Sequence, residues 1–362
     1  MMRLLAALTA NRLNFLLIAA PASWVLHTTA PESSWVFGIA ALSLIPLAGI
    51  IGLGTEELAH RSGPAVGGFL NATFGNAAEL IIAIVALGEG HVGLVKASIT
   101  GSIVGNLLLV LGASFFVGGL GRKSQKFDRT GANNASTMLF LAVVALVMPA
   151  VFDLALYGSL DAHPEAIDDL SLLTSFVLII AYIGSLIYSF MSQRDLFRTG
   201  AEHTADDGHR LSVAQSVALL AIGTILTTIQ AELLVGAMQP ALAQFGFTEM
   251  FVGVIVVAII GNAAEHYSAI IAGRKDQMTL AVEIAVGSSA QIALFVAPAV
   301  VLYSYVLGHP MTLLFNAFEI SAIALSVFAT SMVVADGESN WVEGLQLMSI
   351  YVILGMAFYF VP

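Results

Sequence analysis

Long apolar runs, most of about 20 residues, make up nearly the whole chain and are separated by short polar connections. A helix rises about 1.5 Å per residue, so runs of this length cross the hydrocarbon core of a bilayer. Membrane-spanning strands need only about 10 residues, so these runs indicate helices. The sequence therefore predicts an all-α polytopic membrane protein with eleven transmembrane helices, at residues 13–29, 36–53, 63–89, 91–119, 133–152, 170–191, 211–236, 249–273, 276–305, 312–335 and 342–361.

Composition excludes several functions. Charged residues are 10% of the chain, against about a quarter in soluble domains, and the net charge of -11 does not suit nucleic acid. The absence of cysteine excludes disulfides, thiol catalysis and cysteine metal sites. Arg3 and Arg12 precede an apolar run, as in a signal peptide, but ten further spans follow, which favours an uncleaved first helix. The short connections leave no sizeable soluble domain, so we expect the function to lie in the membrane.

The basic residues predict the orientation, because they concentrate in cytoplasmic loops. With a cytoplasmic N-terminus, 12 of the 13 Lys and Arg fall on the inner side, and only Lys96 does not. Lys96 lies near the outer end of its span, where its stem can snorkel to the interface. The loop at 153–169 has five acidic residues and no basic one, which fits the outer face. We expect the C-terminus to lie outside.

One motif occurs twice. Residues 75–79 and 261–265 both read GNAAE, an offset of 186, and the alignment extends without gaps: residues 67–102 match residues 253–288 at 13 of 36 positions. Apolar composition does not explain an Asn-x-x-Glu repeated in step with a Gly-Ser pair, so a duplication is favoured. The third predicted span runs outward and the eighth runs inward, so the two copies are inverted.

This pattern predicts one peripheral first helix plus two inverted five-helix repeats, a design of secondary transporters in which the site lies at mid-membrane between the halves. We predict an N-terminal transmembrane helix in residues 1–34 and a first five-helix repeat in 35–192. A charged cytoplasmic linker at 193–210 and a second, inverted five-helix repeat at 211–362 complete the chain.

Glu79 and Glu265 lie near the middle of their spans, where a carboxylate is costly and is by default a functional hypothesis. The alternative is a structural pair bonded to each other or to hydroxyls, but no basic residue lies at comparable depth as a partner. Two facing carboxylates supply up to four hard oxygen ligands. This donor set suits a divalent cation, above all Ca²⁺, which takes six to eight oxygens in flexible geometry.

Asn76 and Asn262 precede the two glutamates by three residues and so share their helical face. Each can ligate a metal through its carbonyl or orient the carboxylate through its amide. Gly75 and Gly261 allow the helix to break there, or permit close helix packing, and both interpretations stay open. The following helix of each half adds polar residues for which we favour lining of the ion path over simple interhelical hydrogen bonding: Ser102, Asn106, Ser288 and Gln291.

Glu57 and Glu232 lie near the ends of the second and seventh predicted spans. They are candidate gating residues that could hold an open or closed state through hydrogen bonds. Interfacial snorkelling is an equally good interpretation of both side chains.

At these residues the chain resembles the calcium/proton exchangers of the Ca²⁺/cation antiporter superfamily. The stretches GPAVGGFLNATFGNAAELIIA and GSIVGNLLLVLG are similar to the first repeat of that family, and GNAAEHYSAI and GSSAQIALFVAP to its second. The resemblance covers essentially the whole chain. It implies that Glu79 and Glu265 bind Ca²⁺ and carry protons. Sodium-coupled members have hydroxyl residues beside the repeat glutamate, where this chain has alanines, which favours protons as the counter-ion.

We therefore expect an antiporter, not an enzyme, that exchanges Ca²⁺ for H⁺ in a prokaryotic inner membrane, with Ca²⁺ as cargo and no cofactor. The partners are Ca²⁺, H⁺ and lipid, with no nucleic acid, and a homo-oligomer is left open. The alternatives are an exchanger of the same fold coupled to Na⁺ or K⁺, a channel, and an intramembrane metalloenzyme. The last lacks any HExxH pair.

Overall fold

The computed structural model describes residues 12–158, 164–192, 211–308 and 310–361, so the predicted linker at 193–210 lies outside the described residues. Almost all of the described chain is helical. The first part contains η1 (Arg12–Ile18), α2 (Ala19–Thr29), α3 (Trp35–Arg61), α4 (Gly63–Phe74), α5 (Ala77–Gly88), α6 (Val92–Val104), η2 (Gly105–Val110), α7 (Leu111–Gly119), β1 (Gln125–Lys126), α8 (Arg129–Tyr157) and α9 (Pro164–Ser192). The second part contains α10 (Val213–Gly236), α11 (Met238–Phe245), α12 (Glu249–Phe251), η5 (Val252–Val257), α13 (Ala258–Gly261), α14 (Ala263–Arg274), α15 (Met278–Gln291), η6 (Ile292–Val296), α16 (Ala297–Val306), α17 (Ala317–Val334), β2 (Glu338–Ser339) and α18 (Trp341–Phe360).

Eight helices in the described part of the chain are long and apolar enough to cross a membrane, or nine if the bent pair formed by α11 and Glu249–Gly261 is one span. The first and third predicted spans contain only shorter apolar helices, Leu13–Thr29 and Ala77–Gly88. The third is short because the helix is interrupted between α4 and α5. The chain is thus a helical, multi-spanning protein, and eleven crossings stay a prediction.

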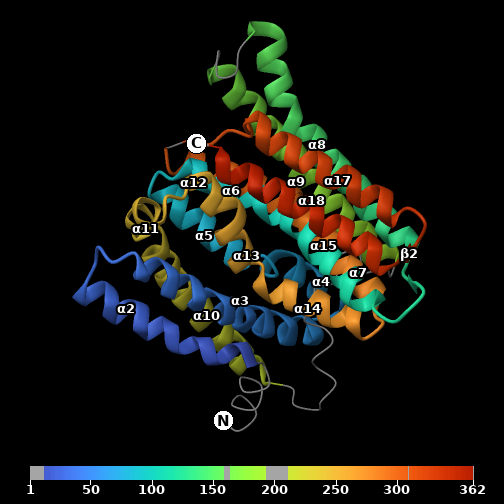
Figure 1. Cartoon of the computed structure of the whole chain (residues 1–362), viewed down its shortest axis with the longest axis horizontal. Coiled ribbons are helices and arrows are strands. Elements are labelled where there is room, and N and C mark those ends of the chain that lie inside the picture. The colour runs from blue at the N-terminus through green and yellow to red at the C-terminus, as the bar shows by residue number, and fades with distance from the viewer. Residues whose placement is uncertain (1–11, 159–163, 193–210, 309, 362) are drawn as a thin grey trace.

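Two of the spans form the centre of the molecule. Within an apolar stretch of 18 residues in each span, 89% is buried in the span made of α15, η6 and α16 and 83% in the span made of α6, η2 and α7, but only 22% in α18. Figure 1 shows α2, α3 and α10 side by side along one flank, with α8 and α9 extending beyond the body on the opposite side. The residues of the predicted site belong to the central spans and to the broken helices beside them.

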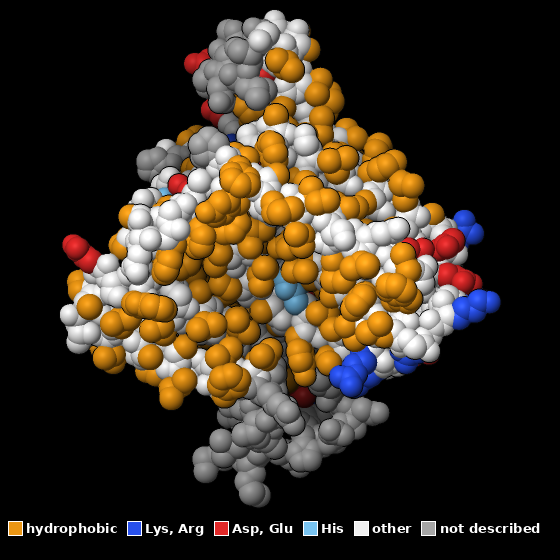
Figure 2. Space-filling view, viewed as in Figure 1, with side chains coloured by type: hydrophobic (Ala, Val, Ile, Leu, Met, Phe, Trp, Pro, Cys, Tyr) orange, Lys and Arg blue, Asp and Glu red, His pale blue; other side chains and the backbone are white. Residues whose placement is uncertain are grey.

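The outer surface is apolar. Large hydrophobic side chains are more than half exposed on several helices, such as Phe140 on α8, Ile180 on α9 and Phe328 on α17. Hydrophobic side chains cover most of the face in Figure 2, and the charged side chains gather at its edge. Soluble proteins rarely expose apolar patches larger than a few hundred Å², so this surface is the one that faces lipid. The protein is an integral membrane protein.

Helix α6 and the segment η5 approach closely because small residues line their contact. A Cβ built on Gly101 would lie 2.1 Å from the carbonyl oxygen of Val254, and one built on Gly253 would lie 2.5 Å from the Cβ of Ala97. Small residues permit such backbone approach between membrane helices, which associate through packing and not through the hydrophobic effect.

Gly101→Ala is expected to destabilise the protein by about 1–3 kcal/mol, because the added methyl group overlaps the backbone of η5. Thermal unfolding of the purified protein in detergent measures this. The matched control is Gly52→Ala in α3, where a Cβ would meet nothing within 4 Å. There the substitution should stabilise by about 0.5–1 kcal/mol. Equal melting temperatures for the two variants would show that the α6–η5 contact yields without cost.

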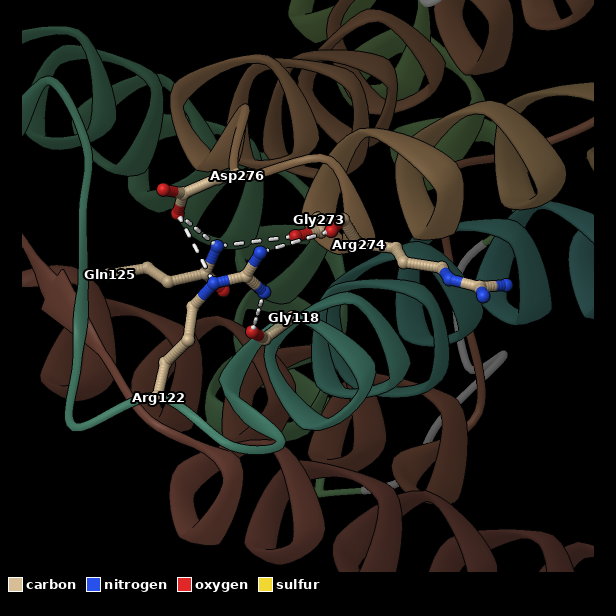
Figure 3. A network of polar contacts seen from close by, with 6 residues as sticks. All are labelled: Gly118, Arg122, Gln125, Gly273, Arg274 and Asp276. Atoms are coloured by element: carbon tan, nitrogen blue, oxygen red, sulfur yellow. Dashed lines mark hydrogen bonds and ion pairs between the residues drawn. The ribbon is translucent and has the colours of Figure 1, made fainter.

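Polar contacts tie the loop after α7 to the turn between α14 and α15 (Figure 3). Gln125 donates from Nε2 to Asp276 Oδ1 at 2.5 Å and to the carbonyl of Gly273 at 3.2 Å. Arg122 Nε lies 4.0 Å from the same Asp276 oxygen. Asp276 has a φ of 63°, and no other non-glycine residue of the described chain has a positive φ. The antiparallel pair β1–β2 then joins this loop to the connection before α18.

Candidate functional site

The two GNAAE stretches are helix breaks. Helix α4 ends at Phe74 and α5 begins at Ala77, while α13 ends at Gly261 and α14 begins at Ala263. Asn76 and Asn262 stand at the breaks with almost the same backbone angles, φ -100° and ψ 27° against φ -93° and ψ 12°. Each break places its glutamate in the first turn of the next helix, where the positive end of the helix dipole favours a negative charge.

The local structure repeats with the offset of 186. Adding 186 to the bounds of α5 (Ala77–Gly88) gives the bounds of α14 (Ala263–Arg274), and the same shift takes the start of α6 to the start of α15. The π-helical segments η2 and η6 also occupy corresponding places, at 105–110 and 292–296. π-helical turns are rare in proteins overall but occur frequently at functional sites. Their recurrence beside the polar residues indicates that this region of both central spans is functional.

Glu79 is buried, at 7% exposure, and both of its carboxylate oxygens lack a hydrogen-bond partner among the described residues. Glu265 is partly exposed and interacts electrostatically with Glu79. Gly261 packs against Glu79, because a Cβ there would lie 3.3 Å from Glu79 Cγ. Gly261 thus both ends a helix and allows close packing. A buried ionised carboxylate without partners is very costly, so this site requires a bound proton or cation.

The six polar residues predicted around the glutamates form one hydrogen-bonded chain across the two copies of the motif. Ser288 Oγ donates to Asn76 Oδ1 at 3.1 Å, and Asn262 Nδ2 donates to Ser102 Oγ at 2.9 Å. Asn76 Nδ2 donates to Gln291 Oε1 at 2.5 Å, and Asn106 Nδ2 donates to Asn262 Oδ1 at 3.0 Å and to Ser288 Oγ at 3.3 Å. The asparagine of each copy is thus bonded to the serine and the amide of the other.

These bonds orient the asparagines. The side-chain carbonyls of Asn76 and Asn262 each accept one hydrogen bond, which leaves one lone pair on each for a cation. Asn106 Oδ1 is buried and accepts no hydrogen bond from the described residues. Three buried oxygens of the site thus accept no hydrogen bond at all from the described residues: the two Glu79 carboxylate oxygens and the Asn106 side-chain carbonyl. All three are hard oxygen donors of the kind that Ca²⁺ binds.

Sequence reasoning missed Ser289, which is fully buried next to the polar chain. Its Oγ donates to the carbonyl of Ala285 in its own helix at 2.9 Å and lies 3.5 Å from the carbonyl of Ile103 in the other central span. The Ser288-Ser289 doublet was the available signal, but only the first serine has a counterpart in the aligned copy.

Glu57 and Glu232, the candidate gating residues, lie apart. Glu57 is buried and accepts a hydrogen bond from the backbone N–H of Leu211, just before α10, at 3.2 Å. Glu232 is exposed and lies 21 residues beyond Leu211, near the other end of α10 and about 30 Å away along the helix. The two side chains therefore occupy opposite ends of α10 and different environments.

A family model described as "Sodium/calcium exchanger protein" matches residues 32–191 and 215–360. The chain is 40% identical to a Ca(2+)/H(+) antiporter of Synechocystis sp., with 96% of each chain covered, and 40% identical to the Ca(2+)/H(+) antiporter ChaA of Bacillus subtilis, with 96% of this chain and 99% of the relative covered. The solved structure of native YfkE is 38% identical and superposes with a TM-score of 0.83, covering 96% of this chain and 100% of that one. The crystal structure of the H+/Ca2+ exchanger CAX has the same fold, at 14% identity and a TM-score of 0.68, with 96% and 91% covered.

Proposed function

The chain belongs to the sodium/calcium exchanger protein family, and we propose that it exchanges Ca²⁺ for H⁺ across a membrane by alternating access, with Glu79 and Glu265 as the shared binding site. The observation that carries this proposal is the buried Glu79 carboxylate, whose oxygens lack partners in the described structure and which interacts electrostatically with Glu265. The relatives with about 40% identity that cover nearly the whole chain are named as Ca(2+)/H(+) antiporters.

Coupling follows from competition for the same oxygens. Ca²⁺ needs ionised carboxylates, whereas the empty apolar site favours protonated ones, so the two cations exclude each other. If the protein rearranges readily only when the site is neutralised, each movement of Ca²⁺ in one direction is matched by protons moving in the other. Asn76 and Asn262 contribute carbonyls, because their amides are already bonded to Gln291 and Ser102. The amides and hydroxyls bonded to them line the ion path.

Protons are the preferred counter-ion because the neighbours of each glutamate are alanines, at 77, 78, 263 and 264. They supply no hydroxyl for Na⁺. The second candidate, Na⁺-coupled exchange on the same fold, is favoured only by the description of the family model. The two candidates differ in one measurable property, the dependence of Ca²⁺ movement on Na⁺.

The proposed architecture is a first helix followed by two inverted five-helix halves, with the N-terminus in the cytoplasm of a prokaryotic cell and the C-terminus outside the inner membrane. The repeated bounds of α5 and α14 and the two separate matches of the family model support the halves. The distribution of Lys and Arg supports the orientation. We place Glu57 at the inner end of α3 and Glu232 at the outer end of α10, where each could act at one mouth of the path.

Ca²⁺ uptake into proteoliposomes loaded at low internal pH tests this function, with internal pH followed by a dye and Na⁺ and K⁺ absent on both sides. We expect Ca²⁺ to enter as protons leave, and empty liposomes to show neither flux. Uptake that begins only after Na⁺ is loaded would favour the second candidate. A Ca²⁺ current without proton movement would indicate a channel.

A further inference from the structure

A histidine and a glutamate meet where the turn between α5 and α6 contacts the start of α12. His91 Nδ1 lies 3.5 Å from Glu249 Oε1, and the two side chains are 23% and 35% exposed. The same Glu249 oxygen accepts a hydrogen bond from the backbone N–H of Leu94, in the first turn of α6, at 3.0 Å. Glu249 therefore caps α6 from the second copy of the repeat, and His91 adds a pairing that depends on its protonation.

The corresponding turn between α14 and α15 has the same backbone and different side chains. The N–H of His91 donates to the carbonyl of Ala86 at 2.9 Å, and the N–H of Gln277, its counterpart at +186, donates to that of Ala272 at 2.9 Å. Gln277 cannot be protonated in this way. That turn is held instead by the Asp276 contacts with Gln125 and Arg122 shown in Figure 3.

The two turns thus differ in how their ties respond to pH. The contacts of the α14–α15 turn, made by Gln125, Arg122 and Asp276, include no histidine. Imidazole is the side chain that changes charge between about pH 5 and 8. A histidine–carboxylate contact is therefore present at this turn in the first copy of the repeat and is replaced by contacts without histidine at the same turn in the second copy.

We propose that His91 and Glu249 form a pH-dependent latch that fastens the start of α12 to the α5–α6 turn when the solution at this face is acidic. The sign follows from charge: protonated His91 forms an ion pair with the Glu249 carboxylate, whereas neutral His91 has no charge to attract it. Charged groups on the pair's own elements and on the helices that pack against them include Glu89 on the turn itself, Lys96 on α6, Glu232 on α10, Glu319 at the start of α17 and Glu343 at the start of α18, with Glu56, Glu57 and Arg61 near the end of α3. Lys96 donates to the carbonyl of Leu314 at 2.7 Å and to Thr312 Oγ1 at 3.2 Å.

In the exchanger proposed above, this face is the outer one, and α12 begins the span that carries Glu265. Acidification outside, which supplies the counter-ion, would then also fasten the outer ends of the two halves together. The assignment to the outer face rests on the proposed function, whereas the latch itself rests on the His91–Glu249 contact.

Hydrogen exchange of the purified full-length protein between pH 5.5 and pH 8 tests the latch without any transport. Protection of residues 86–96, corrected for intrinsic exchange, is compared with that of residues 272–282, the turn with the same backbone and no histidine. We expect this ratio to rise about two- to fivefold on acidification, the range for a partly exposed ion pair.

His91→Gln installs the residue that the other turn already has, and Glu249→Gln keeps an acceptor for Leu94 N–H without the charge. Both variants should show a ratio independent of pH. If His91→Gln retains the wild-type dependence, the latch is wrong. If the wild-type protection ratio does not change with pH, the latch is wrong as well. A normal ratio in protein that fails to exchange Ca²⁺ for H⁺ would leave the latch standing and reject the transport proposal.

Discussion

Glu79→Gln abolishes both Ca²⁺ uptake and the coupled release of protons. Gln has nearly the same shape, but it removes one of the two negative charges and the group that binds a proton. Loss of a buried charge of this kind weakens Ca²⁺ binding by at least about 100-fold, or about 2.7 kcal/mol. The assay is the proteoliposome measurement described above, and Glu265→Gln is expected to fail in the same way.

Glu89→Gln is the matched control, because Glu89 is an exposed glutamate ten residues further along the same segment. It should transport at the wild-type rate. A melting temperature of Glu79→Gln at or above that of the wild type shows that the fold is intact, since the substitution removes a costly buried charge. Proton-coupled Ca²⁺ transport by Glu79→Gln would remove Glu79 from the shared site.

Ca²⁺ affinity should fall steeply with acidification. The empty site takes up protons where Ca²⁺ would bind, so the apparent Kd rises as pH falls and becomes constant at a pH high enough to ionise both carboxylates. In the titrating range we expect about a tenfold rise per pH unit for one competing proton and about a hundredfold rise for two. Ca²⁺ titration calorimetry at a series of pH values measures the slope.

The magnitude of this slope separates the two counter-ions. In Na⁺-coupled exchange the binding step need not involve a proton, so an apparent Kd that does not change between pH 8 and pH 6 would contradict proton competition. His91→Gln provides an internal control. The latch lies outside the binding site, and its loss should leave the slope of Kd against pH unchanged.

The polar chain at the site was largely predictable because four of its six residues repeat with one offset. Asn76 and Asn262 are 186 residues apart, as are Ser102 and Ser288. The asparagine of each copy is bonded to the serine of the other copy. Asn106 and Gln291 break the offset by one residue, yet each bonds to the asparagine of the other copy. The longer side chain of Gln291 makes up for its earlier position. A repeated pattern of side-chain types was sufficient to group these residues.

Other features could not be predicted because apolar patterns do not encode them. The hydropathy of residues 249–273 is continuous, but the helix there contains a π-helical segment and a break at Asn262. The bend of 111° between α11 and α12 depends on the left-handed Gly246 and the cap at Thr248, which composition alone does not place. The burial of Glu57 and exposure of Glu232 depend on which helices cover them, and a single sequence does not specify this.

The π-helical segments also control the rotation of the helices that contain them. A π turn holds one more residue than an α turn, and each residue of an α-helix advances by about 100°. Helix α7 is therefore turned relative to the line that α6 would have continued, and α16 is turned relative to α15 in the same way. The span made of α6, η2 and α7 can thus direct its amide and hydroxyl groups inward over the first half of its length and present glycines, such as Gly112 against Gly344, to a neighbouring helix over the second. A deletion of one residue within η2 or η6 would rotate the helix that follows, α7 or α16, about its own axis, and would not simply shorten the span.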